Sequence, residues 1–267
     1  MKGGVSMDAV LSVLKEFDRM PNNKNFPDKC FVERSLDLYG YLTLFVFVRP
    51  DTRGKFLLTT DKRERFMPTE EPNNGLLFAR IPKLKSLTTK LWQLGVPSKI
   101  IFAVADNSYE LYRGPIEGIV LDTVLMDERR KLYAANLTKR LARDFPQLME
   151  VFSLGLNRVG LFSEDLVIPE DVLAQEIAFQ REFVYSQFYD KQSPTDSIIE
   201  QIVRGKCRAY EEQGLLIEAA DAILIGTEGA DELESWRQRT IMLKLGGAKF
   251  PVVYPYIRKE NLSTGRE

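Results

Sequence analysis

The chain has 267 residues, of which 44% are apolar and 28% are charged. This is an ordinary globular composition, and the length allows one large domain or two small ones. The 37 Lys and Arg residues nearly balance the 38 Asp and Glu residues, so the net charge of -1 gives no global attraction to nucleic acid or membrane. The chain contains no histidine. Hydrolases and metal sites that depend on histidine as a base or ligand are therefore excluded.

The two cysteines, Cys30 and Cys207, are far apart in the sequence and belong to no CxxC pair. They indicate neither a disulfide framework nor a metal site, which fits a reducing compartment. No apolar run approaches the ~18 residues that a membrane span needs, and the start of the chain has no signal-peptide pattern. We therefore expect a soluble, cytoplasmic protein without a bound metal.

The first predicted elements are a helix and two strands. Apolar side chains recur at helical spacing over residues 8–17, and a loop rich in proline and asparagine follows. The run YLTLFVFV at 41–48 is apolar, β-branched and aromatic, which is typical of a strand covered on both faces. Residues 59–75 are polar with two prolines and predict an inserted loop, after which LLFARI at 76–81 predicts another strand.

The rest of the chain alternates between helices and strands. The predicted elements are a helix at 83–94, a strand at 99–106, helices at 128–145, 169–190 and 193–213, a strand at 222–226, a helix near 231–245 and a strand at 250–256. This alternation predicts an α/β fold with three layers, a mostly parallel central sheet and right-handed crossovers. No repeat or domain linker is present, so we expect 1–267 to be a single domain.

Ligands of a parallel α/β sheet bind at the carboxyl ends of its strands, so polar residues directly after strands are the first candidates for a binding site. They are Arg49, Asp51 and Thr52 after the first strand, Asp106 and Asn107 after the second, and Thr227 and Glu228 after the strand at 222–226. Taken singly, each is also typical of a loop or a helix cap. The chain has no P-loop sequence and no GxGxxG fingerprint, which argues against conventional ATP or NAD binding.

The predicted helix at 128–145 is strongly basic. Its cations are Arg129, Arg130, Lys131, Lys139, Arg140 and Arg143, against the two acids Glu128 and Asp144. At about 100° per residue, Arg129, Arg140 and Arg143 share one face, and such a ridge can neutralise several phosphates. A run of charges is also typical of a helix face that only meets water. The helix is therefore a candidate nucleic-acid contact.

The segment AYEEQGLLIEAADAILIG combines a phenol with carboxylates. If it is helical as far as the following strand, four of its positions share a face: Tyr210, Gly214, Glu218 and Asp221. This face leads toward Glu228. Such acids can bind a guanidinium or an α-amine, and a carboxylate that is partly buried beside others has a raised pKa suited to proton transfer. The alternative is an ordinary amphipathic helix whose acids face water.

In order and pattern, these features resemble the tRNA-dependent cyclodipeptide synthases and, more remotely, the catalytic domains of the tyrosyl and tryptophanyl class I aminoacyl-tRNA synthetases. The resemblance covers roughly residues 41 to 256, from FVFVRPDTRGK through the basic helix to Tyr210 and LLIEAADAIL. It implies a Rossmann-like fold and an enzyme that joins the aminoacyl groups of two aminoacyl-tRNAs into a diketopiperazine. No ATP and no metal would be needed, in agreement with the missing histidines.

The resemblance also implies roles for individual residues. The basic helix would hold tRNA, and Tyr210 matches the tyrosine of the family's YxxxE element. Gly214 stands where the family has its glutamate, so Glu218, one turn further along, is the candidate for binding the α-amine and moving its proton. Trp236 lies near the place of a second family aromatic, which would wall the pocket.

The nucleophile that would accept the first aminoacyl group has no exact counterpart. The family's serine comes just after the first strand, where this chain has Arg49-Pro50-Asp51-Thr52. Thr52 is the candidate hydroxyl, with Thr59, Thr60 and Ser86 as substitutes. If none of these hydroxyls proves essential, a covalent aminoacyl-enzyme does not form here.

The acids Glu218, Asp221 and Glu228 favour a cationic substrate, and arginine fits because a carboxylate binds a guanidinium in a bidentate manner. The chain would then resemble a fungal branch of the family whose products contain arginine. Two other functions stay open: a catalytically inactive synthetase-like protein that binds tRNA or a partner, and a small-molecule transferase of unrelated mechanism. A tRNA binder has no use for an acidic pocket, whereas the basic helix argues against the unrelated transferase.

Overall fold

The structure is a computed structural model, and its fold is described over part of the chain. The described residues are 5–20, 22–48, 56–58, 63–66, 75–104, 120–121, 123–145, 149–153, 167–187, 196–226, 240–241, 244–245 and 250–255, in some of which only the backbone is described. None of the helices within these ranges is long and apolar enough to cross a membrane.

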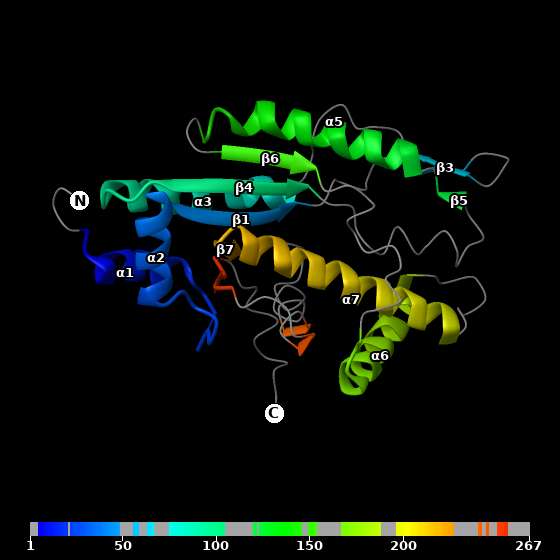
Figure 1. Ribbon diagram of the computed structural model, residues 1–267. Helices are drawn as coiled ribbons and strands as arrows, with labels where there is room; N and C mark the ends of the chain where they lie inside the picture. The colour runs from blue at the N-terminus through cyan, green and yellow to red at the C-terminus, as the bar shows by residue number, and fades with distance from the viewer. Residues whose placement is uncertain are drawn as a thin grey trace.

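The centre of the fold is a five-stranded sheet in which every described pairing is parallel (Figure 1). Its strands are β1 (Leu42–Val48), β4 (Ser98–Val104), β6 (Met149–Ser153), β7 (Ala222–Ile225) and β8 (Val252–Val253), arranged in the order β6-β4-β1-β7-β8. Parallel neighbours cannot be joined by a tight hairpin, so the chain returns across a face of the sheet between them. The predicted α/β class with a parallel central sheet is confirmed.

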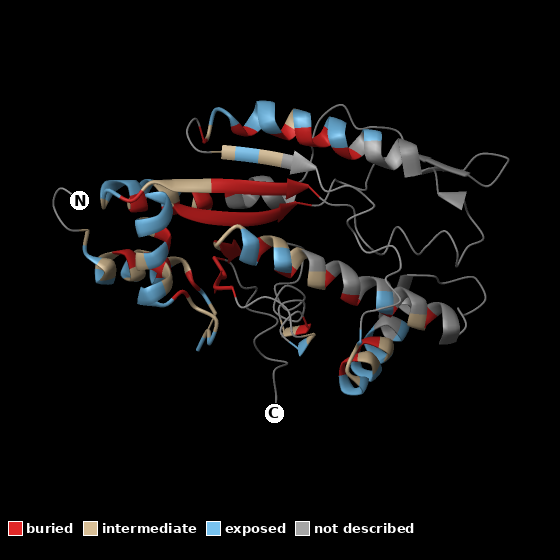
Figure 2. Cartoon of the chain, viewed as in Figure 1, coloured by how far each residue is buried: buried red, intermediate tan, exposed pale blue. Residues whose placement is uncertain are grey.

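Helices cover both faces of the sheet and so give three layers. The helices of the first face are α1 (Met7–Phe17), α2 (Lys29–Tyr39), α3 (Gly75–Gln93) and α5 (Thr123–Leu141), and those of the second face are α6 (Glu170–Gln187) and α7 (Asp196–Ala219). The side chains of β1 alternate between the two resulting cores: Leu44 and Val46 join the first, and Phe45 and Phe47 join the second. This explains the nearly unbroken apolar run of β1, which is buried throughout (Figure 2).

Most of the predicted helices are confirmed with shifted ends. α1 begins and ends within one residue of the prediction, whereas α5 spans Thr123–Leu141 instead of 128–145. α7 continues to Ala219, six residues beyond the predicted end. Asp171, in the first turn of α6, accepts a hydrogen bond of 3.1 Å from Lys244, which lowers the pKa of the Asp171 carboxyl group. Residues 240, 241 and 244 are helical, and the rest of the helix predicted near 231–245 lies outside the described residues.

The prediction of a strand at 76–81 is wrong, because LLFARI belongs to α3. A short apolar run does not by itself distinguish a buried strand from a buried helical turn. The later side chains that α3 buries recur at helical spacing: Ile81, Leu84, Leu87 and Leu91. Ile81, the last residue of the run, belongs to this buried face, and Pro82 stands inside the helix.

Five further elements in the described ranges, four strands and one helix, were not predicted. A second sheet, ordered β2-β3-β5, is formed by β2 (Phe56–Leu58), β3 (Arg63–Phe66) and β5 (Val120–Leu121). β3 lies within the predicted loop at 59–75, and its sequence RERF has no apolar alternation that would mark a strand. The helix α2 and the strand β6 were also missed: α2 starts directly after the predicted loop that follows the first helix, and β6 lies between the helices predicted at 128–145 and 169–190.

Candidate functional site

All five strands of the large sheet end at the same edge, which we call the carboxyl edge; the opposite edge is the amino edge. The strands end at Val48, Val104, Ser153, Ile225 and Val253. In open α/β sheets the ligand binds outside this carboxyl edge. Several residues predicted to lie there fall outside the described residues and stay predictions: Arg49, Asp51, Thr52, Asp106, Asn107, Thr227, Glu228 and Trp236.

Tyr210 is described, and it lies on the inner face of α7. Its side chain is 4% exposed and belongs to the core of the second face, together with Phe45, Phe47 and Leu224. α7 leads through a short turn directly into β7 and therefore runs back along it. The nine residues from Tyr210 to the end of α7 rise about 13 Å, roughly the length of the four-residue strand β7. Tyr210 is thus close to the level of the carboxyl edge.

The acids of the predicted pocket lie at the other end of α7. Glu218 is exposed in the last turn of the helix, about 12 Å further along the axis than Tyr210 and about 80° around it. Asp221 lies in the turn before β7, with a φ of 49°, and its carboxylate pairs with the Arg34 guanidinium of α2 at 2.5 Å. The structure therefore does not bring Tyr210 together with Glu218 and Asp221. Gly214, which lies between them, is buried.

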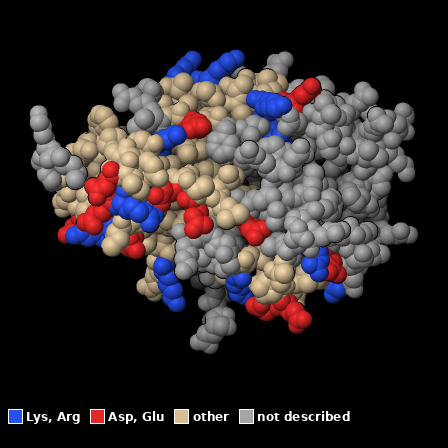
Figure 3. Space-filling model, in the orientation of Figure 1, with Lys and Arg blue, Asp and Glu red and all other residues tan. Residues whose placement is uncertain are grey.

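α5 and the turn that follows it carry exposed cations. Lys131, Lys139 and Arg140 of α5 are exposed, as is Arg143 in the turn, and basic side chains are visible along the edge of the molecule that α5 forms (Figure 3). The inner face buries Tyr133, Ala134, Leu137 and Leu141 against the sheet. Of the acids of this segment, Asp144 pairs with Lys85 of α3 at 3.2 Å. We call the four exposed cations the α5 ridge.

Arg130 is one of the cations of the basic helix that the resemblance assigns to tRNA binding, but it does not belong to the α5 ridge. It is fully buried, and it is among the largest side chains that the protein buries completely. Its place follows from helical spacing, since it lies four residues before Ala134 and seven before Leu137, both on the inner face. A buried guanidinium cannot meet a phosphate at the surface, so its role is internal. The side chain of Arg129 is outside the described residues.

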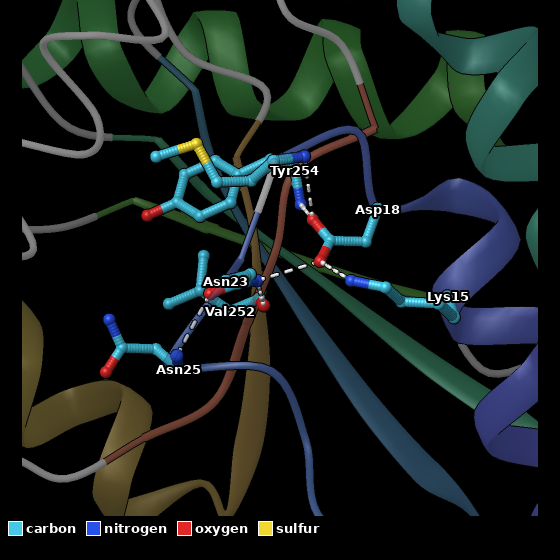
Figure 4. Close-up of polar contacts among 7 residues, drawn as sticks. Lys15, Asp18, Asn23, Asn25, Val252 and Tyr254 are labelled. Atoms are coloured by element: carbon cyan, nitrogen blue, oxygen red, sulfur yellow. Dashed lines mark hydrogen bonds and ion pairs between the residues drawn. The ribbon is translucent and has the colours of Figure 1, made fainter. Parts of the chain in front are cut away.

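A polar cluster that the sequence did not reveal lies at the end of α1 (Figure 4). The buried Asp18 carboxylate accepts hydrogen bonds from the backbone N–H groups of Met20, at 3.3 Å, and Tyr254, at 3.2 Å, on Oδ1. Its Oδ2 accepts from Asn23 Nδ2 at 3.0 Å and from Lys15 Nζ at 3.4 Å. Asp18 thereby links the N-terminal segment to the strand next to the C-terminus.

The segment from Asp18 to Asn25 also provides hydrogen-bond partners for backbone groups on the outer side of β8. Val252 donates its N–H to the Asn25 carbonyl, and its own carbonyl accepts from Asn23 Nδ2, both at 2.8 Å. The Tyr254 carbonyl accepts from the Arg19 N–H at 2.8 Å. An unpaired edge strand is a site of unwanted pairing, and here the segment covers it. Asparagine and aspartate are common in loops, so their abundance in 18–25 does not reveal this partner.

The carboxyl ends of β7 and β8 touch through an aromatic ring. A Cβ atom added to Gly226 would lie 2.7 Å from Cδ1 of Tyr254, which no real side chain tolerates without displacement. The ring of Tyr254 is 1% exposed and shares the second core with Tyr210. Lys83 of α3 donates to the next carbonyl, that of Pro255, at 3.0 Å. These contacts hold the chain where it leaves the sheet.

Metal binding has no support within the described part of the chain, where no three carboxylate or thiol side chains converge. Cys30 is exposed on α2 and Cys207 is buried in α7, and neither forms a disulfide. The substitute nucleophile Ser86 is exposed on α3, whereas Thr59 and Thr60 lie outside the described residues.

No protein-family model matches the chain, and no curated protein matches its sequence. Among solved structures, the chain is similar to tyrosyl-tRNA synthetase from Archaeoglobus fulgidus, with 12% identity, coverage of 93% of this chain and 64% of that one, and a TM-score of 0.42. The chain is also similar to tryptophanyl-tRNA synthetase from Plasmodium falciparum, with 12% identity, coverage of 92% of this chain and 59% of that one, and a TM-score of 0.39. A third similar structure is a cyclodipeptide synthase from Candidatus Glomeribacter gigasporarum, solved bound to Phe-tRNAPhe. Its identity is 10%, the match covers 89% of this chain and 94% of that one, and the TM-score is 0.36.

The chain thus spans less than two thirds of the length of either synthetase. The chain is an α/β protein with an all-parallel five-stranded sheet, and it is structurally similar, at low identity, to class I aminoacyl-tRNA synthetases and to one cyclodipeptide synthase.

Proposed function

We propose that this protein is a tRNA-dependent cyclodipeptide synthase, which joins the aminoacyl groups of two aminoacyl-tRNAs into a diketopiperazine without ATP. The observation that supports the proposal most is the α5 ridge, whose exposed cations lie along α5 and in the turn after it, on one face of the sheet, while Tyr210 lies on α7 on the other face. The sheet supplies the carboxyl edge at which an α/β protein binds its ligand.

The α5 ridge suits a polyanionic partner. The chain as a whole has a net charge of -1, so attraction to tRNA has to come from a local surface. Lys131, Lys139 and Arg140 of α5 and Arg143 of the turn after it offer four cations within residues 131–143. Each phosphate that such a cation neutralises releases condensed counterions, which contributes to affinity and makes it depend on salt.

Tyr210 supports the transfer chemistry. In the proposed reaction, a hydroxyl of the protein attacks the ester carbonyl of the first aminoacyl-tRNA, and the tRNA leaves with its ribose hydroxyl, which takes up the proton. The α-amine of the second aminoacyl-tRNA then attacks the aminoacyl-enzyme ester, which forms the first peptide bond and releases the protein hydroxyl. The dipeptide is now esterified to the second tRNA, and its free α-amine attacks that remaining ester. This attack closes the ring and releases the second tRNA with its ribose hydroxyl, which takes up the proton. Thr52 is the proposed hydroxyl. The phenol of Tyr210, at the level of the carboxyl edge, is proposed to hold the α-amine and assist its proton transfer.

The arginine hypothesis has lost much of its support. Of its three acids, Glu218 faces water at the amino edge, and Asp221 is neutralised by Arg34. Only Glu228 stays as a proposed partner of a cationic substrate. An arginine-containing product is therefore one outcome of the experiment and not part of the proposal.

A second candidate function is a tRNA-binding or partner-binding protein without catalysis. It is favoured by the same separation of Tyr210 from Glu218, because the described residues bring no carboxylate of the predicted pocket to the phenol. This protein would use the α5 ridge alone.

The experiment that distinguishes the two functions uses the purified full chain. The protein is incubated with a mixture of all standard aminoacyl-tRNAs, and the products are searched by mass spectrometry for cyclic dipeptides. We expect at least one cyclic dipeptide, formed together with deacylated tRNA and without added ATP. Binding of tRNA without any dipeptide would reject the synthase and establish the binding protein, whereas neither binding nor product would reject both.

A further inference from the structure

Residues Tyr254 and Pro255, where the chain leaves β8, are held by three separate parts of the fold. The backbone of Tyr254 bonds to the Asp18 carboxylate, at 3.2 Å, and to the N–H of Arg19, at 2.8 Å. The carbonyl of Pro255 accepts from Lys83 of α3 at 3.0 Å. The ring of Tyr254 rests on Gly226 of the neighbouring strand end. The position of this ring is therefore determined from several directions at once.

The contact between Tyr254 and Gly226 lies at the carboxyl edge. Gly226 is buried, directly follows β7 and precedes Thr227 and Glu228, the residues that the sequence predicts at the ligand site. Because the ring of Tyr254 lies against the Cα of Gly226, it sets how closely the end of β8 approaches the point where the chain leaves β7. Any side chain at this position would separate the two strand ends, since its Cβ would lie 2.7 Å from the ring.

Tyr254 and Tyr210 belong to the same core of the second face, which also contains Phe45 and Phe47. The side chains are packed without room for independent movement, so a displacement of one ring is transmitted to its neighbours. Tyr254 is 1% exposed, so its effect on a substrate is exerted through other residues at the edge.

We infer that Tyr254 is a positioning residue of the proposed site and that its ring, seated on Gly226, sets which aminoacyl group the enzyme accepts. The inference rests on the proposed function and adds two residues that the sequence does not single out. The ring and the glycine act as a pair. The missing side chain of Gly226 leaves room for the ring of Tyr254, and the ring fixes the position of the strand end beside the substrate.

The test compares product ratios among variants. Purified Gly226→Ala, Tyr254→Leu and wild-type protein are each given the same mixture of aminoacyl-tRNAs, and the ratio of the two most abundant cyclic dipeptides is measured by mass spectrometry. The matched control is Tyr133→Phe, which alters a buried tyrosine in the core of the other face. A ratio formed in competition does not depend on how much enzyme is folded, so destabilisation alone leaves it unchanged.

We expect both Gly226→Ala and Tyr254→Leu to shift the ratio by roughly tenfold, the discrimination that about one methylene in a pocket supports, and the control to leave it unchanged. A ratio equal to that of the wild type in both variants would overturn the inference alone. Absence of any dipeptide with the wild type would overturn the proposed function and the inference with it. If Gly226→Ala gives no folded protein, Tyr254→Leu decides, because it removes the ring instead of crowding it.

Discussion

Asp18 and Tyr254 are 236 residues apart in the sequence, and the buried carboxylate of the first accepts a hydrogen bond of 3.2 Å from the backbone N–H of the second. The bond joins the end of the first helix to the residue after the last strand of the large sheet. It therefore links the N-terminal and C-terminal parts of the fold, and it holds the carboxyl end of β8 in place.

The first prediction concerns this contact. Asp18→Ala leaves the buried Tyr254 N–H without its acceptor and should lower the free energy of unfolding by about 2–3 kcal/mol. Asp18→Asn keeps one acceptor oxygen and should cost less. The measurement is urea unfolding of each variant. The control is Glu33→Gln, which removes an exposed pair with Lys29 and should change stability by less than about 0.5 kcal/mol. Equal stability of Asp18→Ala and the control would contradict the role of the cluster.

The turn between α7 and β7 gives a second prediction. Asp221 has a φ of 49°, a left-handed conformation that costs most residues roughly 1 kcal/mol but costs glycine little. Asp221→Ala and Asp221→Gly both remove the pair with Arg34, so their difference isolates the backbone. We expect Asp221→Gly to be the more stable by about 1 kcal/mol in urea unfolding. Alanine at least as stable as glycine would contradict the assigned conformation.

A third prediction concerns alkaline pH. Lys99 of β4 donates a hydrogen bond to Glu150 of β6 at 2.8 Å, which raises the pKa of Lys99 above its ordinary value of 10.5. The pair therefore stabilises the fold fully below that pH and loses its contribution as the pH rises through the folded-state pKa. Lys99→Met should be less stable than the wild type at pH 8, and the difference should shrink as the pH rises beyond the ordinary lysine pKa of 10.5. A difference that is constant with pH would show that the pair contributes nothing through charge.

A fourth prediction separates Tyr210 from Glu218. Tyr210→Phe should reduce dipeptide formation by about 100-fold or more if its hydroxyl assists proton transfer, without loss of the fold by circular dichroism. Glu218→Gln should leave the rate within about twofold, because that side chain is exposed at the amino edge. Tyr133→Phe is the control for the loss of a buried hydroxyl. Full activity of Tyr210→Phe would remove Tyr210 from the mechanism, and an inactive Glu218→Gln would restore the glutamate.

The fifth prediction tests the α5 ridge. The double variant Arg140→Glu, Arg143→Glu should bind aminoacyl-tRNA more weakly. The slope of the logarithm of the binding constant against the logarithm of the salt concentration should become shallower, by the amount that about two phosphate contacts contribute. The control reverses two exposed lysines elsewhere, Lys29 and Lys244, and changes the net charge by the same amount. Binding is measured by titration of labelled tRNA over a range of salt concentrations. Equal losses in both double variants would mean that net charge, and not the ridge, attracts the tRNA.

The sequence by itself determined the class of the fold. The runs that became β1, β4 and β7 are apolar almost without interruption, because strands covered on both faces have no side that needs polar residues. The long helices were predicted from their periodicity, and the exposed cations of α5 from the same rule. These features are local, so a window of ten to twenty residues contains all the information that they require.

Only the tertiary structure decided where those features meet. The run 76–81 is part of helix α3 and not a strand, and Arg130 lies inside because helical spacing places it on the same face as Ala134 and Leu137. Glu218 and Asp221 lie at the amino edge because α7 ends before β7 begins, while Tyr210 lies near the other edge. The contacts of Tyr254 with Asp18 and Gly226 join segments far apart in the chain, and no local pattern records such a pairing.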